Sequence, residues 1–241
     1  MKLRSLLFTA AVSVGICANA AEISTYDTRL DVGQDGAAQA SVTLRVTDNQ
    51  SRRLVVPLGF ASVEGLQLQA APAGTQLKLR PSKEQAAVEV ELPEDAAAEF
   101  QLQFAFRVPS LLFEPKPEEG QKSKFAAGTR LLRHGLVNTQ ATRIGAYQAT
   151  VRLPEGTMVQ SVREQLPKPS RKEFIPRVEL DRIDGHQGAL LQVKGLKQGD
   201  RTSMELEVVG DRHSYGWLLI GIVLSIAYHV GFRDSVRRPE A

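Results

Sequence analysis

The feature that most constrains this chain is an alternation of apolar and polar side chains with a period of two residues. Over residues 40–47 alanine, valine and leucine alternate with serine, threonine and arginine, and residues 100–108 place phenylalanine, leucine or valine at every second position. The same pattern recurs over 88–92 and 147–153. Successive side chains of a strand point to opposite faces, so this pattern is typical of strands with one buried face. We therefore expect a mainly β fold of antiparallel strands.

Glycine, proline and aspartate mark the turns between these runs. Gly33 to Gly36, Pro72 to Gly74 and Asp184-Gly185 each separate two apolar segments, and such residues favour tight turns. Short strands at this spacing predict one or two antiparallel β-sandwich modules of the immunoglobulin-like type. The cysteine and tryptophan signature of true immunoglobulin domains is missing, so the likeness is one of architecture only.

Composition divides the region between the termini into two parts. Residues 114–124 are charged and contain proline with no apolar period, which indicates an exposed linker or a long loop. We expect a first β module over 21–108, the linker over 109–135 and a second β module over 136–212. The alternative is one continuous sandwich with a long excursion between two strands.

The N-terminal residues have the pattern of a signal peptide. Lys2 and Arg4 precede an apolar run from Leu6 to Ile16, and Ala18-Asn19-Ala20 supplies the small residues of a cleavage site. We expect residues 1–20 to be removed. Cys17, the one cysteine, would leave with them, so disulfides and thiolate sites are not expected in the remaining chain.

The C-terminal residues predict a membrane anchor. Residues 216–232 contain no formally charged side chain, and we expect a single transmembrane helix over 214–232 with a cytoplasmic tail over 233–241. Trp217 would lie at one interface, and Arg233, Arg237 and Arg238 would lie on the cytoplasmic side. The predicted location is the cytoplasmic (inner) membrane, single-pass, with the bulk of the chain periplasmic or extracellular. A buried helix of a soluble protein is the alternative.

Two further segments are candidate contact sites. Gly221, Ser225 and His229 follow one another at intervals of four, a stripe that could allow another helix to approach closely. The loop from Arg163 to Arg177 is the densest basic stretch away from the termini, and it could rest on an acidic partner or on anionic lipid headgroups. The alternative is a solvated loop in which two glutamates balance the charge of the basic residues. The basic residues of the loop are Arg163, Lys168, Arg171, Lys172 and Arg177.

Local signatures of catalysis are missing from the sequence. No two histidines have the spacing of a zinc protease motif, and there is no nucleophile elbow or phosphate-binding glycine loop. Asp181, Asp184 and His186 could in principle hold a divalent cation, but a hairpin turn explains Asp184-Gly185 equally well. We expect no metal, no cofactor and no enzymatic activity.

The charge balance and the β pattern together favour a binding role. The formal net charge of +3 falls to +1 once Lys2 and Arg4 leave, and no concentrated basic face suggests nucleic acid. We expect a membrane-anchored, non-enzymatic interaction or structural module, or a subunit of a membrane complex, that binds a protein partner or an envelope component through loops or strand edges. The alternative is an envelope hydrolase or carbohydrate-active domain with a carboxylate pair assembled in the fold.

Overall fold

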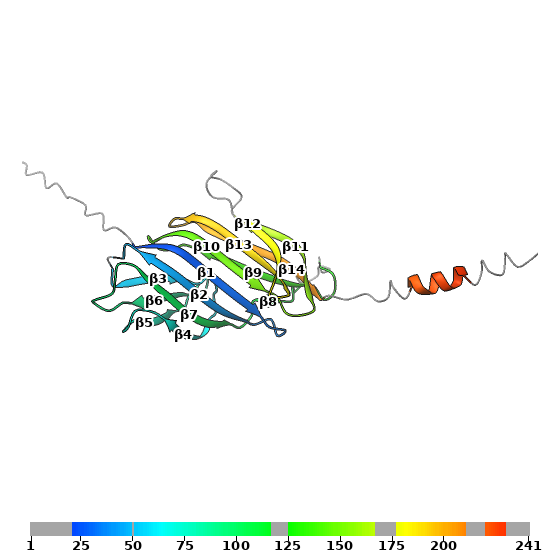
Figure 1. The fold of residues 1–241 in the computed structure, drawn as a ribbon, viewed down its shortest axis with the longest axis horizontal. Coiled ribbons are helices and arrows are strands. Elements are labelled where there is room, and N and C mark those ends of the chain that lie inside the picture. Colours follow the sequence, from blue (N-terminus) through cyan, green and yellow to red (C-terminus); the bar gives the residue numbers. More distant parts are fainter. Residues whose placement is uncertain (1–20, 50, 117–124, 167–176, 211–219, 230–241) are drawn as a thin grey trace, which may run out of the picture.

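The computed structural model describes residues 21–49, 51–116, 125–166, 177–210 and 220–229. This part of the chain is mainly β, which confirms the prediction from the alternation. Its fourteen strands form three sheets (Figure 1).

The largest sheet has seven strands in the order β12-β13-β10-β1-β2-β7-β4. Their bounds are β1 Glu22–Val32, β2 Ala38–Thr47, β4 Glu64–Ala70, β7 Phe100–Val108, β10 Arg143–Arg152, β12 Arg177–Ile183 and β13 His186–Leu196.

Two smaller sheets complete the fold. One has four strands in the order β11-β14-β9-β8, and the other has three in the order β3-β6-β5. Their bounds are β8 Leu112–Phe113, β9 Arg130–Val137, β11 Thr157–Leu166 and β14 Arg201–Gly210, then β3 Arg53–Pro57, β5 Gln76–Arg80 and β6 Ala87–Glu91.

One ladder departs from the antiparallel expectation. Strand β1 pairs with β10 in parallel, whereas the other ladders among the described strands are antiparallel. This ladder places strands from both sides of residues 109–135 in one sheet, so the predicted module boundary does not separate two sheets. The predicted linker itself contains β8 and the first part of β9, while its residues 117–124 lie outside the described ranges. The division into two modules stays a prediction.

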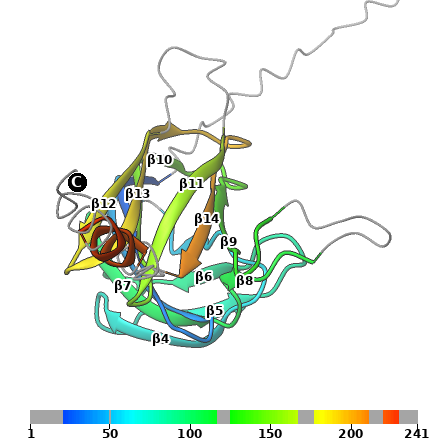
Figure 2. The ribbon, with the colours of Figure 1, turned by 90° about the vertical axis from the view of Figure 1, so that its right-hand side faces the viewer.

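The alternation of the sequence decides which side chains enter the core. In β2 the residues Ala40, Val42, Leu44 and Val46 are buried, and in β7 every second residue from Phe100 to Val108 is buried. Buried side chains of all three sheets belong to one apolar cluster. The two smaller sheets accordingly lie against the same side of the seven-stranded sheet (Figure 2).

Three aromatic and polar side chains join the sheets through this core. Tyr26 of β1 and Tyr147 of β10 are partners in the parallel ladder, and their rings meet edge to face at 5.2 Å between centroids. The Tyr26 hydroxyl donates to the carbonyl of Pro57 in β3 at 2.5 Å. The Tyr147 hydroxyl shares a hydrogen bond of 2.6 Å with Nε2 of His134 in β9. Each tyrosine therefore connects the large sheet to a different small one.

The structure contradicts the prediction of a transmembrane helix over 214–232. The described helix covers residues 220–229. In the part of the chain that the structure describes, no helix is long and apolar enough to cross a membrane. The predicted single-pass location in the cytoplasmic membrane is overturned with it. Trp217, Arg233, Arg237, Arg238 and the predicted signal peptide over 1–20 lie outside the described residues.

Gly59, which follows β3, lies in close contact with strand β9 of the four-stranded sheet. Its φ is 79°, and a Cβ there would lie 2.4 Å from the carbonyl oxygen of Gly135 in β9. Gly199 has a similar φ of 83°, but a Cβ there would meet nothing within 4 Å.

We predict that Gly59→Ala lowers the free energy of unfolding more than Gly199→Ala does. Both variants carry the ~1–2 kcal/mol cost of a left-handed alanine, and only Gly59→Ala adds a backbone clash of about 1–3 kcal/mol. Chemical denaturation followed by circular dichroism measures the difference. Equal losses in the two variants would mean that the close contact between β3 and β9 is not formed.

Candidate functional site

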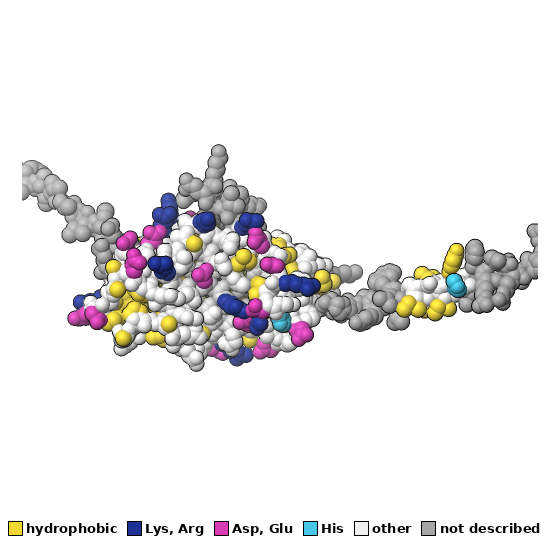
Figure 3. Space-filling view, in the orientation of Figure 1, with side chains coloured by type: hydrophobic (Ala, Val, Ile, Leu, Met, Phe, Trp, Pro, Cys, Tyr) yellow, Lys and Arg dark blue, Asp and Glu magenta, His cyan; other side chains and the backbone are white. Residues whose placement is uncertain are grey.

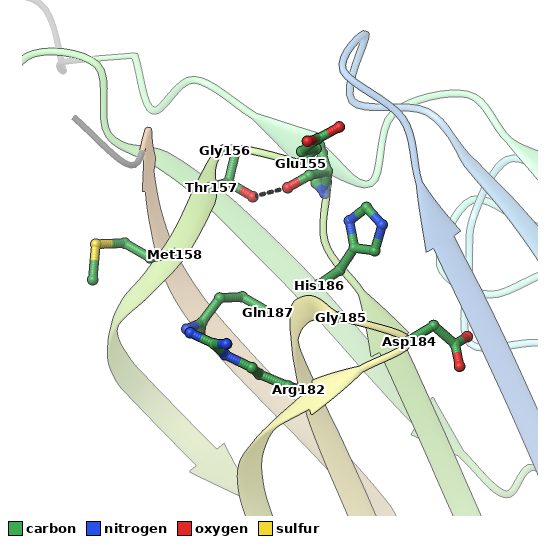
Figure 4. A pocket seen from close by; sticks show the side chains of 10 residues that line it. Glu155, Gly156, Thr157, Met158, Arg182, Asp184, Gly185, His186 and Gln187 are labelled. Carbon is green, nitrogen blue, oxygen red and sulfur yellow. Dashed lines mark hydrogen bonds between the residues drawn. The ribbon is translucent and has the colours of Figure 1, made fainter. Parts of the chain in front are cut away.

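A polar hollow lies between two turns (Figure 4). Its volume is about 490 Å³, and it is bounded by the turn between β10 and β11 and by the hairpin between β12 and β13. The side chains that matter for its chemistry are Glu155, Thr157, Met158, Arg182, His186 and Gln187.

The hairpin at this hollow has the geometry that its sequence predicts. Ile183 pairs with His186, so Asp184 and Gly185 form a two-residue loop. Both loop residues have positive φ, 51° and 83°, as the tightest hairpin turns require, and aspartate followed by glycine accepts this conformation most easily. The predicted hairpin turn at Asp184-Gly185 is confirmed.

The residues considered for a cation are not assembled into a binding site. The Asp184 carboxylate is bound to Arg29 of β1, and it points away from Glu155 and His186 (Figure 4). Within the described ranges there is no group of three or more histidine, cysteine, aspartate or glutamate side chains that could hold a metal ion. The same separation gives no support to a catalytic carboxylate pair formed by Glu155 and Asp184.

Two opposite charges at this hollow have no partner in the part of the chain that the structure describes. Among the described residues, neither the Arg182 guanidinium nor the Glu155 carboxylate forms an ion pair or a side-chain hydrogen bond. The backbone around them is nevertheless held: Gln34 donates to the carbonyl of Glu155 at 2.8 Å, and the Thr157 hydroxyl donates to the carbonyl of Pro154 at 2.6 Å. Free charges on a fixed backbone are available to a ligand.

A second, more apolar hollow adjoins the first. Its volume is about 670 Å³, and Met158 lines both hollows. The Met158 side chain lies on β11 and is 41% exposed. We call the two hollows together, which share Met158, the Met158 surface; the first contributes Arg182 and Glu155, and the second is lined by both apolar and polar groups. The second hollow is lined by Ala127, Gly128, Arg130, Val159, Gln160, Val209 and Gly210 in addition to Met158.

The predicted basic loop is only partly within the described residues. Arg163 on β11 lies 3.1 Å from a carboxylate oxygen of Glu207 and stacks over the ring of Phe125. Arg177 pairs with Glu179 at 2.6 Å. These two arginines are thus neutralised by neighbouring side chains, while Lys168, Arg171 and Lys172 lie outside the described ranges. Basic and acidic side chains are intermixed over the face of the molecule shown in Figure 3.

The predicted helix-pairing stripe falls on the described helix. Gly221, Ser225 and His229 all lie within residues 220–229 and are exposed, as are the large apolar side chains of that helix. Pairing through this stripe stays a prediction.

The most perturbed titratable groups lie in the core and not in a hollow. Burial lowers the pKa of His134 to about 4, and its Nδ1 has no hydrogen-bond partner among the described residues. Burial also raises the pKa values of Tyr26 and Tyr147 well above the ordinary range. His134 is a core residue that we did not predict, although its place midway between the buried Leu132 and Leu136 is a period-two signal for burial.

Comparison with known proteins leaves the chain without a family. No family model and no curated protein matches it. Among solved structures it is similar to the leukotriene A4 hydrolase of Saccharomyces cerevisiae (11% identity, TM-score 0.41, 78% of this chain and 29% of that one). It is also similar to an M1 zinc metallopeptidase of Deinococcus radiodurans (14% identity, TM-score 0.34, 78% of this chain and 42% of that one). A further similar structure is aminopeptidase A of Legionella pneumophila (11% identity, TM-score 0.37, 77% of this chain and 21% of that one). The chain spans less than half the length of these proteins, and a likeness at this level assigns neither a family nor an activity.

We predict that His134 makes the stability of the fold depend on pH. Because its pKa is about 6.5 unfolded and about 4 folded, the unfolded chain binds more protons between these values. The free energy of unfolding should therefore fall as pH drops from 6.5 toward 4, by about 3 kcal/mol from this group alone.

Denaturation of the wild type and of His134→Gln over this pH range measures the effect. The variant keeps a polar group at the site and should lose this part of the pH dependence, while the contribution of the carboxylates stays common to both proteins. Parallel curves for the two proteins would contradict the assignment.

Proposed function

We propose that this protein is a non-enzymatic interaction module that binds a partner protein at the Met158 surface. The observation that carries the proposal is the pair of free, opposite charges, Arg182 and Glu155, beside an exposed methionine. Arginine and methionine are enriched in protein interfaces, and a flexible thioether adapts to the shape of a partner.

Several arginines elsewhere on the molecule are already paired within the chain. Arg29, Arg107 and Arg133 are each bound to carboxylates of their own chain, so they offer little to a partner without breaking an existing contact. Arg182 and Glu155 can bind a partner without first breaking an ion pair with another described residue of this chain. A partner segment with an acidic and a basic group next to an apolar side chain matches the chemistry of the surface.

The architecture suits this role because the surface is carried by fixed turns. In this proposal the module is a β-sandwich, an arrangement that the contacts of Tyr26 and Tyr147 with the two smaller sheets support. The Arg29–Asp184 ion pair ties the hairpin to β1. The turns then lose little conformational entropy when a partner binds, which favours affinity.

We predict that the double variant Met158→Lys, Arg182→Glu loses its specific partners. The lysine places a charge in the apolar part of the surface and the glutamate reverses the free cation. Affinity purification of the tagged full-length chain with quantitative mass spectrometry should show recovery of those partners reduced by at least tenfold, since each tenfold step corresponds to only about 1.4 kcal/mol.

Lys194→Glu is the matched control, because Lys194 is exposed on β13 and lies away from both hollows. It should leave recovery unchanged, and circular dichroism should show that all variants are folded. Equal recovery by the double variant and the wild type would refute the Met158 surface as the binding site.

A further inference from the structure

Strand β4 is an edge of the seven-stranded sheet with one side open. It pairs with β7 and stands last in the order of the sheet, so no described strand covers its other side. An edge strand presents unpaired N–H and C=O groups along that side, which can bind another strand. All residues of β4 except Leu66 are exposed.

The other edges of the three sheets carry charges or proline or are very short, whereas β4 is mostly uncharged and is interrupted by two register irregularities. Proteins block edge pairing with charged residues, with proline or with very short strands. From Gly65 to Ala70, β4 contains neither a charge nor a proline, and its one charged residue, Glu64, lies at the end beside Arg107. The protecting residues of the other edges are Arg177, Glu179, Asp181 and Arg182 in β12, Lys78 and Arg80 in β5, Arg53 and Pro57 in β3, and Arg163 in β11, while β8 has only two residues.

The sequence of β4 is complementary to itself. An antiparallel pair of two β4 strands with a two-fold axis at Gln67 places Leu66 of one copy opposite Leu68 of the other, and Gln67 opposite Gln67. Apolar pairs directly opposite one another stabilise a ladder. Glu64 would face Ala70, so the pairing brings no like charges together. An interface that contacts itself in this way is the usual basis of a two-fold dimer.

We propose that a second copy of this chain binds along β4, in antiparallel register about Gln67, and joins two seven-stranded sheets into one. The register shifts of the β4–β7 ladder lie on either side of the Gln67–Leu68 step, so these two residues next to the axis are the ones in regular register with β7. Leu68, which is 42% exposed in one copy, becomes covered in the pair. The proposal is independent of the Met158 surface.

The expected dimer is weak and reversible. Pairing of one strand with another buries less than the ~1,200–2,000 Å² of a standard interface. We expect association in the range of roughly 1–100 µM, which sedimentation velocity of the full-length chain can measure.

The sharpest test uses charge exchange at Gln67, whose side chain is exposed and so can be replaced without disturbing the core. Gln67→Lys alone and Gln67→Glu alone should each weaken self-association at least tenfold, because like charges then face each other across the axis. An equimolar mixture of the two variants should restore the dimer. The control Gln101→Lys introduces the same charge at an exposed position of β7, inside the sheet, and should leave association unchanged.

Each result decides the proposal. Loss in both single variants with recovery in the mixture supports pairing along β4. A wild-type chain that stays monomeric up to ~100 µM, or a dimer that Gln67→Lys leaves intact, as pairing through helix 220–229 would produce, overturns it.

Discussion

The parallel ladder between β1 and β10 is the contact on which the rest of the structure depends. It joins strands that are far apart in the sequence into one seven-stranded sheet, and it places Tyr26 beside Tyr147. From this point the Tyr26 hydroxyl reaches Pro57 in the three-stranded sheet, and the Tyr147 hydroxyl reaches His134 in the four-stranded sheet. Phe60 extends the same cluster, since its ring lies against both His134 and Phe106. Buried polar groups that are hydrogen-bonded in this way specify one arrangement of the sheets, because any other would leave them unsatisfied.

Because the core encloses its polar groups, binding to a partner involves residues at the surface of the fold. The groups with strongly shifted pKa values, His134, Tyr26 and Tyr147, are enclosed and cannot meet a substrate. The groups that can meet a partner lie where turns and edges reach the surface, at Arg182 and Glu155 beside Met158 and along the open side of β4. Both surfaces are supported by the same rigid sheet, one through the Arg29–Asp184 pair and the other through the ladder to β7. Stability and binding are thus served by different residues.

The parts of the structure that follow from local sequence could be predicted, and those that depend on distant contacts could not. The alternation over 40–47 and 100–108 predicts the buried faces of β2 and β7 because the side-chain period of a strand is a local property. Asp184-Gly185 predicts its hairpin for the same reason. Nothing local indicates that β1 pairs with β10, that Arg163 is bound by glutamates of β14, or that Arg182 and Glu155 line one hollow. The apolar run over 216–232 predicts a spanning helix, yet no helix among the described residues is long and apolar enough to cross a membrane.

The measurement that tests this account most directly is native-state hydrogen exchange of the wild type and Tyr147→Phe. If the β1–β10 ladder makes the three sheets one cooperative unit, amides of β2 and of β13 should open with the same free energy. Removing the Tyr147 hydroxyl, which leaves His134 without its partner, should lower both by the same amount, roughly 1–3 kcal/mol. A loss of protection confined to β9, β10 and β13, with β2 and β7 unchanged, would contradict the account, because the two halves of the chain would then unfold separately.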